Sequence, residues 1–345
     1  MATKMKVLLN GYSGFAKLDG HNLLMTSFSL SMNENVINSE GVGRILRKRI
    51  TTSTSLNGRL VVQHVFERYK LNAVRDYPGY DISIGVEANP DILDYLFTKI
   101  TTNFHSFVEL KFTDNASGIS YDFDSTCLTS FTLSVGNDSA AMLQLNFITF
   151  KDEIDVTICQ NGYDKKAIRY APEEFVGAVL MPYWAWGIET RDIYGNYLND
   201  EDLYDFSITY SQNVAPKYGC FGVNDQNAIK PSKVIFGVPE VKYDLTYVVA
   251  NSASVSDYLI ASNLVSISRR NMVVKYHQVL PPYSLINQTE TKTVDFSFTM
   301  TDCYPDSYSP QYANSGDVNK MSVSGTVYGK INYEKIVDEE ASSNP

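Results

Sequence analysis

The chain carries an internal repeat, and this repeat constrains its fold more than any other feature. The stretch 28–36 returns 178 positions later as 206–214, and the match extends without a gap over 28–43 and 206–221. Five of these sixteen positions are identical: Phe28, Ser29, Asn35, Val36 and Gly41 return as Phe206, Ser207, Asn213, Val214 and Gly219. In both copies, large apolar residues alternate with Ser or Thr. This period of two predicts a strand with one apolar face.

Two further blocks repeat in the same order. Residues 80–83 (Tyr-Asp-Ile-Ser) return at an offset of 163 as 243–246 (Tyr-Asp-Leu-Thr). Residues 131–134 (Phe-Thr-Leu-Ser) match 296–299 (Phe-Ser-Phe-Thr) near an offset of 165. Three blocks in one order predict two divergent copies of one domain, and 345 residues are enough for two domains of ordinary size.

The composition and the local signals predict a mainly β fold with one helix per copy. The chain has 24 Tyr and 17 Phe, residues that favour strands. Asp19-Gly20 between apolar runs is a hairpin signal. Asn89-Pro90-Asp91 begins a helix with an apolar stripe that includes Leu93 and Phe97. In the second copy, Ser254 is placed to cap an equivalent helix over 254–264. The predicted class is therefore two tandem β-barrel or β-sandwich domains.

The domain boundaries follow from the repeat and from changes in composition. The first domain is predicted at 1–160 and includes a long basic loop at about 44–79 that the second copy lacks. A linker at 161–180 leads to the second domain at 181–335, and a frayed acidic tail follows at 336–345. Residues 302–317 are rich in Tyr, Pro, Ser and Asn, which indicates a loop.

The extra loop of the first copy supplies the candidate contact residues. Its basic run and a turn signal give six candidates: Arg44, Arg47, Lys48, Arg49, Asn57 and Gly58. Such a run is commonly a solvated face. The sharper hypothesis is that it contacts an acidic surface on a neighbouring copy of the chain.

The sequence contains no recognisable catalytic constellation. It has none of the phosphate-binding, dinucleotide-binding, zinc-protease or nucleophile-elbow motifs. The histidines are scattered, and Asp122 with Asp124 is a poor match to a metal loop. Trp184 and Trp186 suit either a sugar platform or, better, strand packing or an inter-domain contact. We therefore expect no enzyme activity, no cofactor and no metal.

The net charge and the cysteines limit the binding partners and the compartment that we expect for this chain. The net charge is −10, which argues against a grip on nucleic acid but suits DNA that slides past without sticking. The spacing of the four cysteines suits neither a zinc site nor a disulfide framework. We therefore expect reduced thiols in a protein that is made in the host cytoplasm. No apolar run approaches the roughly 18 residues that a membrane helix needs, so no membrane partner is expected.

The repeated pattern resembles the tail-tube family of bacteriophage tails and related contractile injection systems. The resemblance rests on the early strand that ends in Asn35-Val36 near Gly41 (and Asn213-Val214 near Gly219), the long loop that follows, and the single helix after mid-domain strands. It implies self-association side by side around a channel: a trimer whose six domains make a pseudo-sixfold ring, stacked into a tube for DNA. It also implies a virion location and contacts with other tail or baseplate proteins.

Three alternatives stay open at this point. The same duplication suits a baseplate hub or an adaptor, which need not stack on itself. A sliding-clamp-like ring would want a basic inner face. A duplicated β-rich ligand-binding module would use Tyr and Trp, and specific affinity for glycans would favour it.

Overall fold

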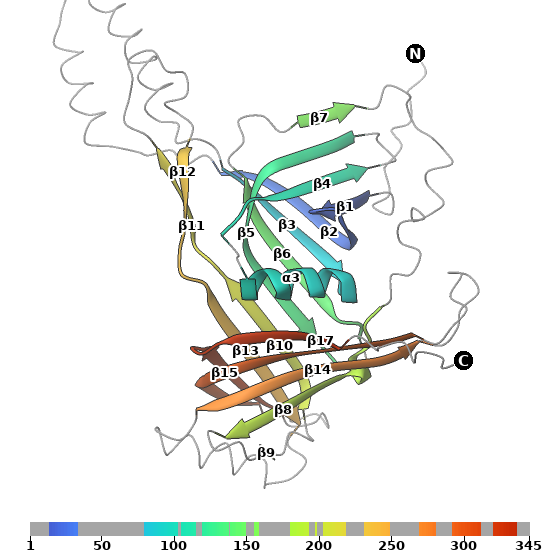
Figure 1. Ribbon diagram of the computed structural model, residues 1–345, viewed down its shortest axis with the longest axis vertical. Coiled ribbons are helices and arrows are strands. Elements are labelled where there is room, and N and C mark those ends of the chain that lie inside the picture. Colours follow the sequence, from blue (N-terminus) through green and yellow to red (C-terminus); the bar gives the residue numbers. More distant parts are fainter. Residues whose placement is uncertain are drawn as a thin grey trace, which may run out of the picture.

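The computed structural model describes residues 14–33, 79–102, 105–114, 119–137, 139–149, 155–158, 180–192, 197–198, 203–218, 231–248, 269–280, 292–311 and 320–336. Within these residues α3 (Pro90–Thr102) is the only α-helix, and almost everything else is strand (Figure 1). The first half holds β1 (Gly14–Leu18), β2 (His21–Asn33), β3 (Gly79–Glu87), β4 (Val108–Asp114), β5 (Ile119–Val135), β6 (Met142–Thr149) and β7 (Asp155–Ile158). The second half holds β8 (Trp186–Asp192), β9 (Tyr197–Leu198), β10 (Leu203–Ser211), β11 (Val214–Tyr218), β12 (Pro231–Phe236), β13 (Glu240–Val248), β14 (Arg270–Leu280), β15 (Lys292–Gln311), β16 (Lys320–Val327) and β17 (Ile331–Ile336). The predicted mainly β class is confirmed.

The first half closes into a barrel of six strands. The strands follow the order β4-β1-β2-β3-β6-β5, and β5 pairs back with β4. Closure is possible because β5 is long: its first part pairs with β4, and its second part pairs with β6. Large side chains such as Phe123, Phe131 and Phe147 fill the interior and are almost fully buried.

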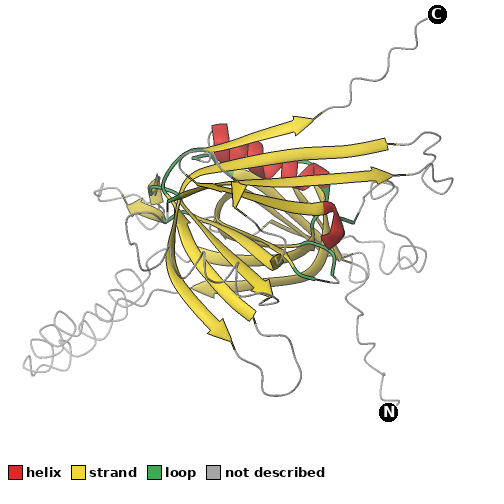
Figure 2. Cartoon of the chain, turned by 90° about the horizontal axis from the view of Figure 1, so that it is seen from below, coloured by secondary structure: helices red, strands yellow, loops and turns green. Residues whose placement is uncertain are grey.

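The second half repeats this arrangement with strands in the order β10-β13-β16-β15-β14-β8-β9. The long strand β15 takes the part of β5: it pairs first with β14 and then with β16. The short strand β17 takes the part of β7, because it pairs with β15 where β7 pairs with β5. Figure 2 shows the strands curving around a common interior, with α3 at one side.

Irregularities in strand pairing recur at matching places, which supports the duplication independently of residue identity. The bulge between Met25 and Ser27 in β2 corresponds to the one between Leu203 and Asp205 in β10. Bulges also recur between Val108 and Leu110 and between Arg270 and Met272. A third pair lies between Leu128 and Ser130 and between Pro305 and Ser307. Bulges are stable features of a fold family, so three matched bulges indicate one ancestral unit.

The registers confirm one repeated block and correct the other two. Phe28 lies opposite Ile84, and Phe206 lies opposite Leu245, which agrees with the offset of 178 for this strand. The same pairs set β3 against β13 at an offset of 161, not 163, a slip of two residues that keeps every side chain on its face. The equivalence of 131–134 with 296–299 is wrong. Phe131 lies in the part of β5 that pairs with β6, whereas Phe296 lies in the part of β15 that pairs with β14 and β17.

The predicted loop at 302–317 is also wrong over its first part. Strand β15 runs on to Gln311, and residues 303–311 pair with β16. Pro305 and Pro310 made this stretch look like a loop. Proline is nevertheless compatible with an edge strand, because the missing N–H then faces no neighbour.

The predicted hairpin turn at Asp19-Gly20 is confirmed, and a cluster of polar contacts holds it. Asp19 and Gly20 both have positive φ, at 46° and 86°, as a type I′ turn requires. The Asp19 carboxylate accepts hydrogen bonds from the Tyr95 hydroxyl (2.5 Å), the Lys99 ammonium (3.0 Å) and the Glu109 backbone N–H (2.7 Å). Burial alone would raise the pKa of Asp19, but these donors outweigh it and hold the pKa below the usual 3.8.

The Asp19 cluster predicts a pH-dependent contribution to stability. The folded pKa lies below the unfolded value, so the stabilisation is present above about pH 4 and is lost as the pH falls through the folded pKa. We expect Asp19→Asn, which still tolerates positive φ, to lower the free energy of unfolding near neutral pH and to flatten its fall in acid. Urea unfolding from pH 2 to pH 7 would test this, with Asp205→Asn as a control of equal charge change. Parallel pH profiles for the wild type and Asp19→Asn would contradict it.

Helix α3 forms as the sequence predicts and joins the two halves. The Asn89 side chain caps it by accepting a hydrogen bond from the Ile92 N–H (3.0 Å). The Phe97 ring stacks on Phe298 with centroids 4.4 Å apart, and it also lies near Tyr333 (5.8 Å) and Phe131 (6.0 Å). Phe298 and Tyr333 belong to strands of the second half, so α3 of the first half covers the place where the halves meet (Figure 1).

Of the two tryptophans, Trp186 lies in the core and Trp184 lies at the surface. Trp186 packs edge-on against Phe206, Tyr276 and Phe296, as the strand-packing interpretation predicts. Trp184 is 63% exposed. Several other predictions fall outside the described residues: the helix at 254–264, Gly41, Gly219, most of the proposed linker and the acidic tail. The domain boundaries therefore stay predictions.

Candidate assembly edges

The two halves are joined by an antiparallel strand pair, here called the internal junction. Residues 130–135 of β5 pair with 206–211 of β10, from Ser130 opposite Ser211 to Val135 opposite Phe206. This pairing merges both halves into one continuous sheet. At its centre, the Thr132 and Thr209 hydroxyls are hydrogen-bonded at 3.1 Å. Just beyond its end, the Gln212 N–H donates to the Thr129 carbonyl at 2.7 Å.

The apolar side chains of the internal junction are buried. Phe131 and Leu133 on one strand and Phe206, Ile208 and Tyr210 on the other are at most 4% exposed. The Phe131 and Tyr210 rings stack across it with centroids 5.5 Å apart. Hairpin β11–β12, which follows β10, packs Val214 and Phe236 against Cys127 of the first half. Backbone pairing, apolar packing and a covering hairpin therefore act together here.

At one end of the continuous sheet, β2, the equivalent of β10, has no partner among the described strands along most of its outer side. Strand β2 pairs with β3 along 24–33, but β1 reaches only residues 21–23 on its other side. Phe28 and Leu30, the counterparts of the buried Phe206 and Ile208, are only partly buried. Residues 26–33 contain no proline and no charge, the usual protections of an exposed strand edge. Such an edge invites pairing with another strand.

An aromatic cluster beside the β2 edge is also incompletely covered. The Phe28 ring stacks on Phe112 with centroids 4.1 Å apart, and Phe112 lies 5.9 Å from Tyr121. All three are partly exposed. The registers make Phe298 the counterpart of Tyr121, and Phe298 is fully buried under Phe97. Among the described residues, nothing covers this side of the first half as Phe97 covers Phe298 in the second.

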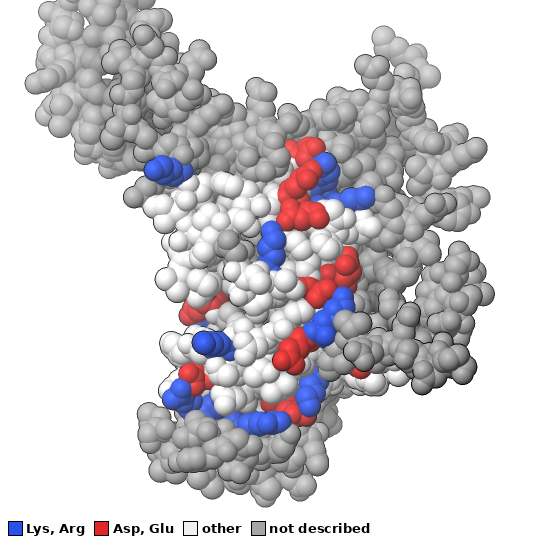
Figure 3. Space-filling view, in the orientation of Figure 1, with Lys and Arg blue, Asp and Glu red and all other residues white. Residues whose placement is uncertain are grey.

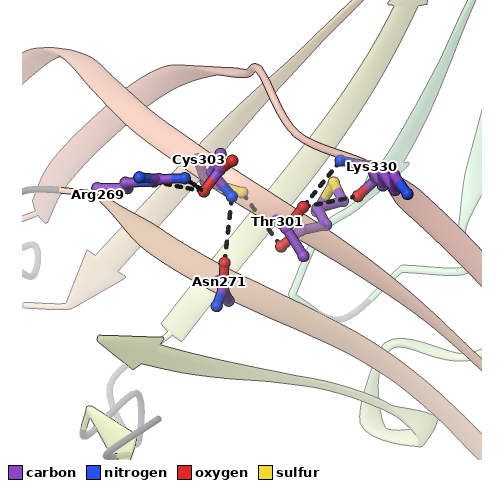
Figure 4. A network of polar contacts seen from close by, with 7 residues as sticks. Arg269, Asn271, Thr301, Cys303 and Lys330 are labelled. Atoms are coloured by element: carbon purple, nitrogen blue, oxygen red, sulfur yellow. Dashed lines mark hydrogen bonds and ion pairs between the residues drawn. The ribbon is translucent and has the colours of Figure 1, made fainter. Parts of the chain in front are cut away.

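At the other end of the sheet, the second part of β15 is the counterpart of the β5 segment in the internal junction. Residues 304–311 pair with β16 and with no other described strand. The chain reaches this position through a bend at Asp302, which has a positive φ of 56°. The Asp302 N–H donates to the Asn271 side-chain oxygen (3.1 Å), and its carboxylate is paired with Arg269. Thr301 exchanges hydrogen bonds with the Lys330 backbone, so the bend is fixed from both sides (Figure 4).

The β15 edge differs from its counterpart in two respects. Pro305 and Pro310 stand where β5 has Leu128 and Leu133, as the matched registers with β16 and β6 show. Tyr304 and Tyr328 form an edge-to-face pair with centroids 5.4 Å apart and are 37% and 70% exposed. Tyr304 occupies the place of the buried Cys127, which hairpin β11–β12 covers. An open edge and an uncovered aromatic pair thus lie together.

Eight strands of the sheet present one polar face, here called the polar face. They follow the order β2-β3-β6-β5-β10-β13-β16-β15. Ser and Thr side chains recur in cross-strand rows, for example Ser134, Ser207 and Ser324 around Asp244. Within the first half, Gln144 donates to Ser83 (2.7 Å), Ser83 donates to Asn146 (2.7 Å), and Asn146 donates to Ser130 (2.9 Å). Hydroxyl and amide groups therefore dominate this surface.

The charges on the polar face are few and mostly acidic. Asp81, Glu87, Asp205, Glu240 and Asp244 outnumber Lys242 and Lys320. Lys242 is paired with Glu240 at 3.3 Å, and Lys320 lies 3.7 Å from the centre of the Tyr204 ring. On the side of the molecule drawn in Figure 3, acidic and basic side chains alternate and are separated by wide uncharged areas. The described residues of these two surfaces form no continuous basic patch of the kind that a grip on nucleic acid needs.

The described residues form no metal site, and their two buried thiols are poorly suited to react. No group of three or more His, Cys, Asp or Glu side chains there suits a metal ion, and no described helix is long and apolar enough to cross a membrane. Burial raises the pKa of the Cys127 and Cys303 thiols to about 12, which disfavours reactivity. The six contact candidates predicted from sequence (Arg44, Arg47, Lys48, Arg49, Asn57 and Gly58) lie outside the described residues.

Comparisons with known proteins give weak likenesses. No protein-family model matches the sequence, and no curated protein matches it. Among solved structures, a chain of the PVC sheath–tube complex of an extracellular contractile injection system matches at 9% identity and a TM-score of 0.28. That match covers 48% of this chain and 99% of the other chain. An Hcp protein matches at 10% identity and a TM-score of 0.23, over 44% of this chain and 98% of its own length. At these TM-scores the likenesses carry no argument, so a function has to rest on the geometry of the chain itself.

Sequence reasoning missed both open edges. It placed the contact candidates in the long loop of the first copy and treated the stretch containing Pro305 and Pro310 as a loop. The signal for β2 was nevertheless present, because residues 26–33 carry no edge protection. No sequence signal indicates that β5 pairs with β10. This pairing is seen only in the structure.

Proposed function

We propose that this chain is a structural subunit of a bacteriophage tail tube or of a related injection tube. Three chains join edge to edge into a ring of six similar domains, and the rings stack around a channel. The observation that carries the proposal is the continuous sheet: two copies of one unit are joined through β5 and β10, while the counterparts of these strands, at its two ends, have no partner on their outer sides among the described strands. Joining the ends repeats a contact that the chain already makes.

Ring symmetry follows from the form of this contact. The internal junction uses different strands on its two sides, so it is heterologous, and repeating it yields a closed ring or an open filament. Closing the ring removes the exposed strand edges, which are otherwise sites of uncontrolled pairing. A ring of three double units is the smallest pseudo-sixfold arrangement of such a chain.

The polar face supports a channel role. In a closed ring it lines the interior, because the opposite face of the same strands packs into the barrel cores. A surface of hydroxyls and amides with a slight acidic excess offers DNA few attractive charges, and like charge keeps the polyanion from binding. The channel would therefore guide DNA without holding it.

The oligomeric state tests this proposal. We expect the purified chain, examined over a concentration series by mass photometry and negative-stain electron microscopy, to form rings of three chains with an open centre. Stacking of the rings supports a tube, whereas unstacked rings favour the alternative of a baseplate hub or adaptor. Monomers at the highest concentration reached, or a closed dimer, would contradict the proposal.

A further inference from the structure

The internal junction determines how two chains would meet, provided that the ring proposed above forms. Matched bulges and registers give residues 25–33 of β2 the counterparts 203–211 in β10, and residues 296–311 of β15 the counterparts 119–134 in β5. Thr209 corresponds to Ser31, and Thr132 corresponds to Ser309. Because Thr132 lies opposite Thr209, the same register places Ser309 of one chain opposite Ser31 of the next.

We propose that the edge of β15 binds β2 of a second copy of this chain in the register that places Ser309 opposite Ser31, and that Pro310 makes this chain–chain junction the weaker of the two kinds in the ring. In this register Pro310 lies opposite Leu30, where the internal junction has Leu133 opposite Ile208. The paired segments, 307–311 and 29–33, are uncharged on both sides.

The choice of a second copy as the occupant rests on the unburied residues at both edges. On the β2 side, Phe28 and Leu30 are partly exposed although their counterparts in β10 are buried. On the β15 side, Tyr304 is exposed although its counterpart Cys127 is fully buried beneath the hairpin that follows β10. Each edge therefore leaves side chains uncovered whose counterparts at the internal junction are buried.

Pro310 makes the chain–chain junction different from the internal one. Its position opposite Met321 of β16 is tolerated in a ladder only if the side without an N–H faces away from β16. That side is the open edge. When β2 of a second copy pairs there, Leu30 lacks the hydrogen bond that the Leu133 N–H can give to β10 at the internal junction. Proline on an edge is also a common device against uncontrolled pairing. A ring would therefore form and open at its chain–chain junctions.

Disulfide trapping tests the register, with a matched control inside the chain. We expect the double variant Ser31→Cys with Ser309→Cys to give dimers and trimers on non-reducing gels after mild oxidation. The variant Thr132→Cys with Thr209→Cys occupies the equivalent internal pair and should give only an intrachain bond. The wild-type chain and the two single variants control for the native cysteines. The off-register variant Ser29→Cys with Ser309→Cys should cross-link far less.

The outcomes separate this inference from the proposed function. Three-chain rings without a 31–309 cross-link would overturn the junction and leave the ring standing. Equal trapping of the 29–309 pair would overturn the register. The absence of both rings and cross-links would contradict the proposed function, and the junction would fall with it.

Discussion

Phe97→Ala is expected to lower the free energy of unfolding by about 3–5 kcal/mol, the usual cost of emptying a buried Phe site. Phe97 is 1% exposed and touches aromatic rings from both halves: Phe131 from the first, and Phe298 and Tyr333 from the second. The loss is large against a total stability of about 5–15 kcal/mol for a typical domain. Thr98→Ala, an exposed neighbour on the same helix, should change stability by less than about 0.5 kcal/mol.

The two tryptophans make the Phe97 measurement specific for coupling between the halves. Trp184 lies just before β8, and Trp186 is the first residue of β8 and packs into the core of the second half. Urea unfolding followed by tryptophan fluorescence therefore reports on the second half, whereas Phe97 belongs to the first. A shifted fluorescence transition in Phe97→Ala shows that α3 stabilises the neighbouring half. An unshifted one would mean that the stacking on Phe298 contributes nothing.

Local signals in the sequence were sufficient for elements whose cause is local. The Asp19-Gly20 turn requires positive φ at both residues, and Asp-Gly is one of the residue pairs favoured in such turns. Helix α3 begins at a cap made by Asn89, and its buried stripe follows the helical period. The strand at 28–33 and its copy at 206–211 were predictable because alternation fixes their faces. In each case the deciding residues lie within one turn or one strand.

Long-range features were not predictable for a physical reason. A period of two leaves register free to slip by two residues, which is the error at β3 and β13. Strand β15 was missed beyond residue 301 because proline indicates a loop when its neighbours are unknown, whereas next to β16 it marks an edge. The candidate site depends on which strands remain unpaired once β5 has bound β10. Which strands remain unpaired is determined by the pairing of the whole sheet, so no short sequence motif predicts it.

Pro310→Leu is expected to increase ring assembly about a hundredfold. The substitution restores the residue type that β5 has at the equivalent position, Leu133, and with it an N–H on the open side of β15. One net hydrogen bond contributes about 1 kcal/mol, which is roughly fivefold in an equilibrium constant. Three chain–chain junctions in a ring multiply this to about two orders of magnitude. The concentration at which rings appear in mass photometry should fall accordingly.

Pro305→Leu provides the matched control for Pro310→Leu. Pro305 also stands on the open side of β15, at the position of Leu128. Its counterpart lies outside the stretch 130–135 that pairs with β10, so restoring its N–H adds no hydrogen bond between chains. Assembly of Pro305→Leu should therefore stay close to that of the wild type. Equal gains in both variants would show that loss of general edge protection drives association. Unchanged or weaker assembly of Pro310→Leu would show that β15 does not bind β2 through this residue. A gain confined to Pro310→Leu is the result that a paired chain–chain junction requires, because only there does the restored N–H meet a partner strand.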